Sequence, residues 1–176
     1  MRIIVPIGIS GSGKSTLYDN YFKDYQLICP DQIRLELTGN ISDQSKNNEV
    51  FNIVNERIDD CLKNGIDFYY DATNVNTKFR KVFTKMVKEK KPDAKVIYIY
   101  FTPDIDVSFD RIKNDLENNV VRSNVPKNVL ERQLNLYIET IKSSWRDEGA
   151  DNAFVLDNHS AINKYADELE QILNLK

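Results

Sequence analysis

The stretch that decides the fold is GISGSGKST, residues 8–16. Residues 2–7, which precede it, are mostly Ile and Val and predict a buried strand. The residues that follow it, among them Leu17, Tyr21 and Phe22, have the apolar spacing of a helix. A buried strand, a glycine-rich loop that ends in Lys-Ser and then a helix is the arrangement of a phosphate-binding P-loop.

The chemistry of this loop favours a bound nucleoside triphosphate. Glycines let several backbone N–H groups converge on one phosphate, and the N-terminus of the helix favours an anion. Lys14 has the length to reach the outer phosphates, and the Ser15 hydroxyl is a ligand for Mg²⁺. The alternative is a flexible Gly/Ser turn without a ligand, but the eight-position pattern is complete. We therefore predict that ATP or another nucleoside triphosphate binds, with Mg²⁺, at Gly8, Ser10, Gly11, Ser12, Gly13, Lys14, Ser15 and Thr16.

Pro6 is unexpected in the strand before the loop. Proline lacks an N–H group, so it removes a ladder donor from a strand that should lie centrally in a sheet. We interpret it as a local irregularity in that strand.

Length and composition favour one domain over residues 1–176. Apolar residues make up 41% of the chain and charged residues 29%, as in ordinary soluble proteins. No apolar run has the length of a membrane span, and the N-terminus does not read as a signal peptide, so we expect a cytoplasmic protein without a membrane partner. Cys29 and Cys61 lack metal-site spacing and are expected to be reduced. Because the net charge is −3, a nucleic-acid substrate would require a local basic patch.

Strand-like and helix-like segments alternate along the chain, which predicts an α/β fold with a parallel sheet of about five strands and helices on both faces. The expected strands are residues 2–7, 25–29, 66–70, 94–101 and 153–156. The clearest expected helices are residues 47–64, a segment from about 104, a stripe from Leu130 to Trp145 and a closing helix over 162–173. Asn, Ser and Pro interrupt the pattern over residues 114–126, which predicts a mobile loop.

Asp31 and Arg34 follow the second expected strand. Ligands bind at the carboxyl ends of parallel strands, so these residues should lie at the same sheet edge as the glycine loop. A carboxylate there could accept a proton from an attacking hydroxyl, and an arginine could hold an anionic acceptor. The alternative is a helix-capping Asp beside a surface Arg.

Asp71, Thr73 and Asn74 follow the third expected strand. Asp71 could ligate Mg²⁺ through water or hold Ser15, and the other two could fix either the acceptor or the loop backbone. A simple turn stabilised by Asp and Asn is the alternative.

The interrupted segment at residues 111–126 contains Arg111, Lys113 and Arg122. An arginine on a mobile segment can close over the γ-phosphate and stabilise its transition-state charge, so we predict a lid. The alternative is a solvated helix and loop.

Other polar positions are weaker candidates. His159 follows a strand end and is interpreted as an exposed loop residue. The lysine-rich stretch at 85–91 is interpreted as a solvated helix end. The pocket for the nucleotide base is expected near Asp151 or residues 157–160.

Residues 8–16, 30–34 and 71–76, in this order, resemble the 5′-hydroxyl polynucleotide kinases. This family includes phage end-healing enzymes and the kinase domain of bacterial RNA-repair proteins. Residues 109–129 look like the lid of that family, and the similarity extends over about residues 3–156.

The resemblance implies a role for each matching residue. Asp31 would be the general base for the 5′-hydroxyl, and Arg34 would contact the phosphate backbone of the acceptor. Lys14 and Ser15 would hold the triphosphate and Mg²⁺, and Arg111 would be a lid arginine. It also implies RNA or DNA 5′-hydroxyl ends as the substrate, a bacterial or phage-infected host cytosol and compatibility with a homo-oligomer.

The lid departs from the family pattern. A second arginine usually stands four residues after the first, and here that position is Asp115. Arg122 or Lys113 could substitute for it. The phosphatase and ligase modules often fused to such kinases have no counterpart in these residues, so separate enzymes would supply those steps.

The function predicted from these motifs is ATP-dependent phosphorylation of the 5′-hydroxyl ends of RNA or DNA. A kinase of a small acceptor, such as a nucleoside, nucleotide, sugar or modified base, shares the same loop and a similarly placed Asp. An NTP-driven switch that transfers phosphate only to water is the second alternative, and it would need no base for an organic hydroxyl.

Overall fold

The computed structural model describes residues 1–157 and contains a five-stranded sheet in which every neighbouring pair is parallel. The strand order is β2-β3-β1-β4-β5. The strands are β1 Arg2–Ile7, β2 Gln26–Ile28, β3 Phe68–Tyr70, β4 Lys95–Phe101 and β5 Asn152–Leu156. This confirms the predicted α/β fold with its parallel sheet.

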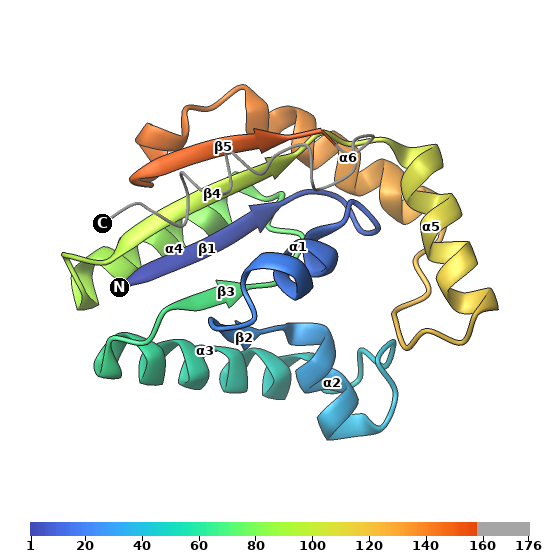
Figure 1. Ribbon diagram of the computed structural model, residues 1–176, viewed down its shortest axis with the longest axis horizontal. Coiled ribbons are helices and arrows are strands. Elements are labelled where there is room, and N and C mark those ends of the chain that lie inside the picture. The colour runs from blue at the N-terminus through green and yellow to red at the C-terminus, as the bar shows by residue number, and fades with distance from the viewer. Residues whose placement is uncertain (158–176) are drawn as a thin grey trace.

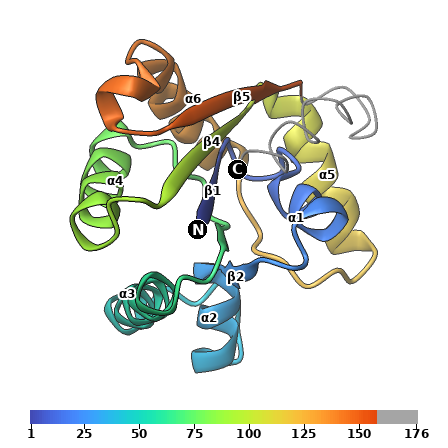
Figure 2. The ribbon, with the colours of Figure 1, turned by 60° about the vertical axis from the view of Figure 1, so that its left-hand side comes forward.

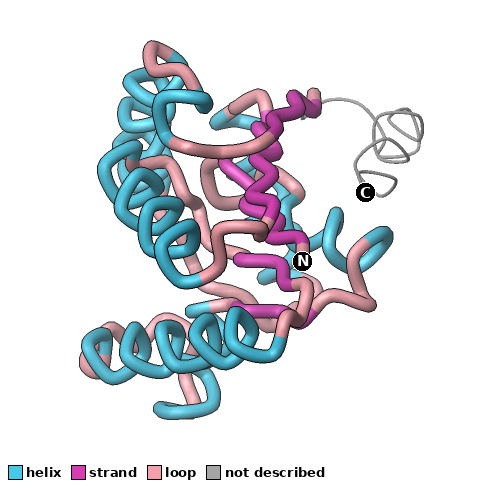
Figure 3. Tube along the Cα trace, turned by 90° about the vertical axis from the view of Figure 1, so that its left-hand side faces the viewer, coloured by secondary structure: helices cyan, strands magenta, loops and turns pink. Residues whose placement is uncertain are grey.

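Helices connect the strands and cover both faces of the sheet, as Figures 1 and 2 show. The helices are α1 Lys14–Tyr21, α2 Pro30–Thr38, α3 Asn47–Asn64, α4 Thr77–Lys90, α5 Ile105–Glu117, α6 Lys127–Ile141 and the 3₁₀ helix η1 Trp145–Glu148. In the view of Figure 3, most of the helical layer lies to one side of the strands. The architecture is that of a P-loop kinase-like fold.

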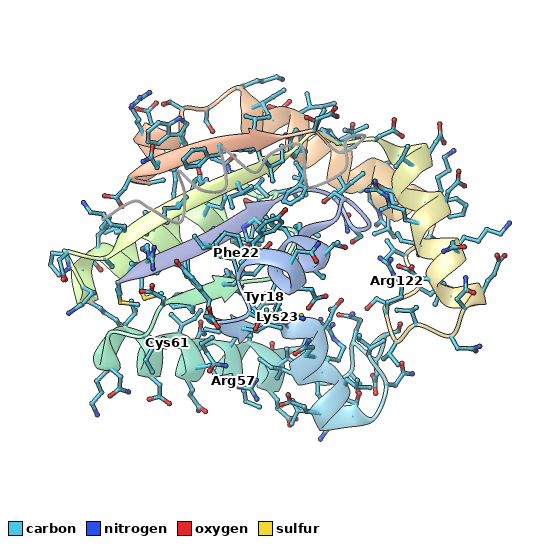
Figure 4. All side chains as sticks on the ribbon, viewed as in Figure 1. Tyr18, Phe22, Lys23, Arg57, Cys61 and Arg122 are labelled. Atoms are coloured by element: carbon cyan, nitrogen blue, oxygen red, sulfur yellow. The ribbon has the colours of Figure 1, made fainter. Side chains whose placement is uncertain are left out.

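The core has one cluster on each face of the sheet. The larger cluster joins the sheet to α3, whose buried Val50, Val54 and Ile58 form the predicted apolar stripe. The smaller cluster joins it to α1, where Tyr18 and Phe22 (Figure 4) pack near the Tyr69 ring, with centroid separations of 5.4 and 5.5 Å. Apolar burial on both faces explains why the strands read as continuous apolar runs.

Pro6 does not disturb β1, so the predicted irregularity is wrong. The strand is unbroken, and Pro6 stands opposite Ile99 in the ladder with β4. On the other side, β1 pairs with β3 only at Ile3 and Ile4, and the Pro6 carbonyl accepts from Asn74 Nδ2 at 2.9 Å. Because the N–H and C=O of one strand residue face the same neighbour, the missing N–H faces the side where β3 has already ended.

The helical boundaries differ from expectation around the predicted lid. Helix α5 does not stop at Asn114 but continues to Glu117, so the lid segment comprises the end of α5 and the loop at residues 118–126. Helix α6 ends at Ile141, and Trp145 begins η1 instead of continuing the long helix. His159 and the expected closing helix at 162–173 lie outside the described residues.

Among residues 1–157, none of the helices combines the length and the apolar character needed to cross a membrane.

Candidate active site

A cleft of about 1270 Å³ is lined by residues that follow the carboxyl ends of the strands and by residues of α5 and the loop after it. It collects residues from each segment that the sequence analysis singled out. The site residues that line it are Ser10, Gly11, Ser12, Gly13, Lys14, Ser15, Thr16, Asp31, Arg34, Asp71, Thr73, Arg111 and Arg122. The structure therefore brings together the glycine loop, the residues after β2 and β3, and the lid.

Two glycines of the loop stand at positions where the backbone conformation or a close contact disfavours a side chain. Gly11 has φ +79°, and a Cβ there would lie 2.5 Å from the Ser108 carbonyl oxygen. Gly13 has φ +99° and precedes α1, whose first turn receives no hydrogen bond from a capping side chain. The uncapped N–H groups and the helix dipole suit a phosphate.

Lys14 follows the last glycine of the loop as the first residue of α1, and it is 7% exposed. Its ammonium group donates to the carbonyl oxygens of Gly8 and Ile9, at 3.1 and 2.7 Å. Burial lowers the pKa of Lys14 from 10.5 to about 8, with Asp71 and Asp31 opposing the shift and Arg122 adding to it. The protonation of Lys14 therefore depends on its burial and on the charges of these three residues.

Ser15 and Asp71 form the pair that suits a magnesium ion. Ser15 Oγ donates to Asp71 Oδ2 at 2.8 Å, and burial raises the pKa of Asp71. A hydroxyl and a carboxylate beside the triphosphate site are oxygen donors of the kind that Mg²⁺ prefers. The buried Tyr69 hydroxyl donates to the Lys14 carbonyl at 2.7 Å, so it fixes the backbone directly before Ser15.

Asp31 is held from two directions. Arg34 Nη1 donates to Asp31 Oδ1, and Ser123 Oγ donates to Asp31 Oδ2 at 3.0 Å. Arg34 is 5% exposed and also contacts Asn47 Oδ1 at 3.2 Å, so it fixes both the carboxylate and the start of α3. The local pattern Asp-x-x-Arg places the two side chains on one helical face, as predicted.

The lid arginines reach different parts of the cleft. Arg111 Nη1 donates to the Gly11 carbonyl at 3.4 Å, so it lies over the glycine loop. Arg122 lines the cleft and pairs with Asp115, and Figure 4 shows it beside α5. Lys113 is 65% exposed and lies 3.8 Å from Glu117, and it is not among the residues that line the cleft. Of the two proposed substitutes for the second arginine, Arg122 lines the cleft and Lys113 does not, and the role of Arg122 stays a prediction.

Thr73 and Asn74 support the backbone of the site. Gly8 N–H donates to the Thr73 carbonyl at 3.0 Å. Asn74 has φ +52°, and its Nδ2 donates to the carbonyls of Pro6, Tyr70 and Ala72 at 2.9–3.2 Å. Asn74 therefore contacts the backbone at the end of β1 and after β3, and its role toward an acceptor stays a prediction.

Three features were missed by sequence reasoning. Gln133 of α6 accepts from Ser10 N–H at 2.8 Å and donates to its Oγ at 3.2 Å. Ser123 reaches Asp31 across the cleft. Arg80 and Glu148 form a buried ion pair, at 2.7 Å, with Arg80 Nη1 also donating to the Asn74 carbonyl at 2.6 Å. No local pattern marks the pairs Ser10–Gln133, Asp31–Ser123 and Arg80–Glu148, because the two members of each pair are far apart in the sequence.

Two further expectations concern other residues. Asp151, just before β5, does not line the cleft. Its carboxylate accepts from Lys88 Nζ at 2.6 Å and from Val96 N–H at 2.8 Å. Asp157 does line the cleft, whereas residues 158–160 are outside the described part. Cys29 and Cys61 are free and buried, and burial raises the pKa of Cys29 to about 12, which disfavours a reactive thiolate.

Comparisons with known proteins agree with this architecture. A family model described as "AAA domain" (AAA_33) matches residues 3–139. No curated protein matches the chain. A chain in a structure of the Pnkp1/Rnl/Hen1 RNA repair complex is 20% identical, with a TM-score of 0.70, over 80% of this chain and 45% of that chain. The present chain thus spans less than half the length of that relative.

Two other solved structures match almost end to end. A putative kinase from Chloroflexus aurantiacus is 13% identical, with a TM-score of 0.66, over 98% of this chain and 95% of the other. Shikimate kinase from Acinetobacter baumannii is 15% identical, with a TM-score of 0.56, over 98% and 91% of the two chains. At these identities the likeness shows the fold, which implies nucleotide binding.

Proposed function

The chain belongs to the AAA domain family whose model covers residues 3–139, and from this premise we propose that it phosphorylates the 5′-hydroxyl ends of RNA or DNA with ATP. The observation that carries the proposal is the position of Asp31. Its carboxylate lines the same cleft as Lys14, and its charge acts on that lysine. A base and a phosphate site on one cleft are what transfer to an organic hydroxyl requires.

In the proposed reaction, the acceptor hydroxyl attacks the γ-phosphorus in line with the bond to the β-phosphate, and Asp31 takes its proton. Lys14, Arg111 and Arg122 stabilise the charge that develops on the transferred group. Ser15, supported by Asp71, would hold Mg²⁺, which supplies further neutralisation of the phosphate oxygens when bound. Arg34 fixes the orientation of the base through its contact with Asp31 Oδ1.

The acceptor side of the cleft supports a nucleic-acid substrate. Phe51 on α3 is 46% exposed, and Val120 and Val121 in the lid loop are 50% and 68% exposed, yet all three line the cleft. Exposed apolar side chains beside an arginine suit nucleobases and the phosphates between them. The structural likeness to a chain of an RNA repair complex supports the same substrate class. Separate phosphatase and ligase enzymes are the partners that the resemblance to polynucleotide kinases implies.

A small-molecule acceptor is the second candidate, favoured by the almost complete overlap with shikimate kinase. The test is phosphoryl transfer from γ-labelled ATP with Mg²⁺ to a panel of acceptors. The panel contains 5′-hydroxyl oligonucleotides of RNA and DNA, nucleosides, nucleotides, sugars and shikimate. We expect label on the oligonucleotides.

Three variants test whether phosphoryl transfer depends on the proposed site. Lys14→Ala should abolish transfer, and Asp31→Asn should lower its rate by about a hundredfold or more while nucleotide binding persists. Asp43→Asn is the matched control, because Asp43 is a partly exposed carboxylate of the loop after α2 that accepts from the Ser45 N–H and does not line the cleft. Label only on a small acceptor would move the function to the second candidate. Label only on free phosphate, unchanged in Asp31→Asn, would indicate an NTPase switch.

A further inference from the structure

Ser123 places a hydroxyl group directly on the proposed base. Its Oγ lies 3.0 Å from Asp31 Oδ2 and 3.3 Å from the Ile41 carbonyl oxygen. Both neighbours are acceptors, so the single hydroxyl proton is shared between them. Arg34 occupies the other carboxylate oxygen, Oδ1, and this leaves Oδ2 as the atom on which an acceptor hydroxyl would bind.

The chemistry of that hydroxyl matches the proposed substrate. The serine side chain ends in a primary alcohol, as does the 5′-carbon of a nucleic-acid end. In the mechanism above, the nucleophile is a primary alcohol that donates its proton to Asp31. Ser123 already makes this contact within the chain.

The position of Ser123 also relates it to the phosphate site. It lines the same cleft as the glycine loop and directly follows Arg122. Lys14, which would hold the γ-phosphate, lines this cleft together with Asp31 and Ser123, so the Ser123 side chain and the phosphate site belong to the same cavity.

We propose that Ser123 is an internal phosphoryl acceptor, which the chain phosphorylates from a bound nucleoside triphosphate when no 5′-hydroxyl end is present. This inference rests on the proposed function, because it uses Asp31 as the base. Ser123 Oγ forms a bond to the γ-phosphorus while the bond from that phosphorus to the β-phosphate oxygen breaks. The proton passes from Oγ to Asp31 Oδ2, and the products are phosphoserine and a nucleoside diphosphate.

The modification would limit the kinase. A phosphoserine carries nearly two negative charges at neutral pH and would lie against the Asp31 carboxylate, where the acceptor must bind. Arg34 and Arg122 are the cations available to hold it. Transfer to oligonucleotides should therefore fall as Ser123 becomes phosphorylated, and an oligonucleotide present from the start should slow the modification.

The experiment incubates the full chain with γ-labelled ATP and Mg²⁺ without an acceptor, and mass spectrometry of peptides then locates the label. We expect one phosphoryl group per chain, on Ser123, and its loss in Ser123→Ala and Asp31→Asn. Ser42→Ala is the matched control, because Ser42 is another serine that lines the cleft. Its backbone N–H donates to Asn40 Oδ1, whereas the serine that donates to Asp31 is Ser123. This variant should be labelled like the unmodified protein.

Transfer to an oligonucleotide is measured in parallel. In Ser123→Ala, the apparent KM for the oligonucleotide should fall severalfold, because a competing hydroxyl has been removed from Asp31. Transfer to oligonucleotides that depends on Asp31, without label on Ser123, would overturn this inference alone. Label on another residue that persists in Ser123→Ala would also overturn it. Absence of transfer to both acceptors would instead overturn the proposed function.

Discussion

Arg122 forms an ion pair with Asp115, which joins the loop at residues 118–126 to the last turn of α5. The pair is half-buried at the edge of the cleft, with 22% of the Arg122 side chain and 36% of the Asp115 side chain exposed. Asp115 occupies the position at which the resembling kinases carry a second lid arginine. The acidic residue therefore orients a cation that comes from elsewhere in the lid.

Arg122→Ala is expected to lower kcat for phosphoryl transfer by about a hundredfold or more, because a lid arginine acts mainly on transition-state charge. Steady-state kinetics with ATP and a 5′-hydroxyl oligonucleotide measure the effect. Lys113→Ala removes a neighbouring cation that is exposed and pairs with Glu117, so its kcat should stay near that of the unmodified protein. Equal losses in the two variants would contradict the assignment of Arg122.

Asp71→Asn should weaken the apparent affinity for Mg²⁺ by about ten- to hundredfold, because the partner that orients the Ser15 hydroxyl loses its charge. Titration of activity with Mg²⁺ at saturating ATP measures the shift. Asp67→Asn is a suitable control, since Asp67 precedes β3 and pairs with Arg2, at 3.1 Å, away from the cleft. An unchanged magnesium requirement in Asp71→Asn would show that Ser15 needs no support from this carboxylate.

Nucleotide affinity should fall as the pH rises through about 8, because the free protein loses the Lys14 proton near that value. Phosphate oxygens favour the charged lysine, so binding at about pH 9 should be accompanied by proton uptake. Calorimetry in two buffers with different ionisation enthalpies measures this uptake. Its absence would mean that Lys14 keeps its proton in the free protein at that pH.

The same pKa shift has an opposite effect on stability. The pKa is about 8 in the folded state against 10.5 for an unperturbed lysine, so the unfolded chain binds more protons between these values. The Lys14 contribution to the free energy of unfolding should therefore rise with pH from about 8 to 10.5. Denaturant unfolding of the unmodified protein and of Lys14→Met, compared across that range, isolates the contribution of Lys14.

Arg80→Met and Glu148→Gln should each reduce the free energy of unfolding by about 3–5 kcal/mol, because each leaves the other charge buried without its partner. Only 2% of the Arg80 side chain is exposed, and none of the Glu148 side chain is. Urea unfolding gives the values. The double variant Arg80→Met/Glu148→Gln should recover much of the loss, and strictly additive losses would show that the pair is not energetically coupled.

Much of the fold could be predicted because its determinants are local. The glycine loop, the apolar strands and the stripe of α3 each reside in a short stretch of sequence, and Asp-x-x-Arg places Asp31 beside Arg34 by helical spacing alone. The edge of a parallel sheet then brings the segments after β1, β2 and β3 together without further information.

The remaining parts of the site depend on packing between distant segments. Ser123 meets Asp31 only because the loop after α5 returns across the cleft, and Gln133 meets Ser10 only because α6 packs beside the glycine loop. Helix α5 continues past Asn114, where polar residues suggested a break, because helical hydrogen bonds tolerate Asn and Asp on an exposed face. Pairings of this kind leave no period or motif in the sequence.

Pro6 has one more consequence for the site. Its nitrogen carries no hydrogen, so β1 cannot donate a ladder hydrogen bond to β3 at this residue. The proline itself therefore favours the separation of the two strands beyond Ile4. The Asn74 side chain holds the diverging ends at the Pro6 carbonyl. The segment with Asp71 is therefore preorganised beside Ser15 in the free protein. A nucleotide that binds there would find the two side chains that we propose for magnesium already ordered, with less entropy left to lose.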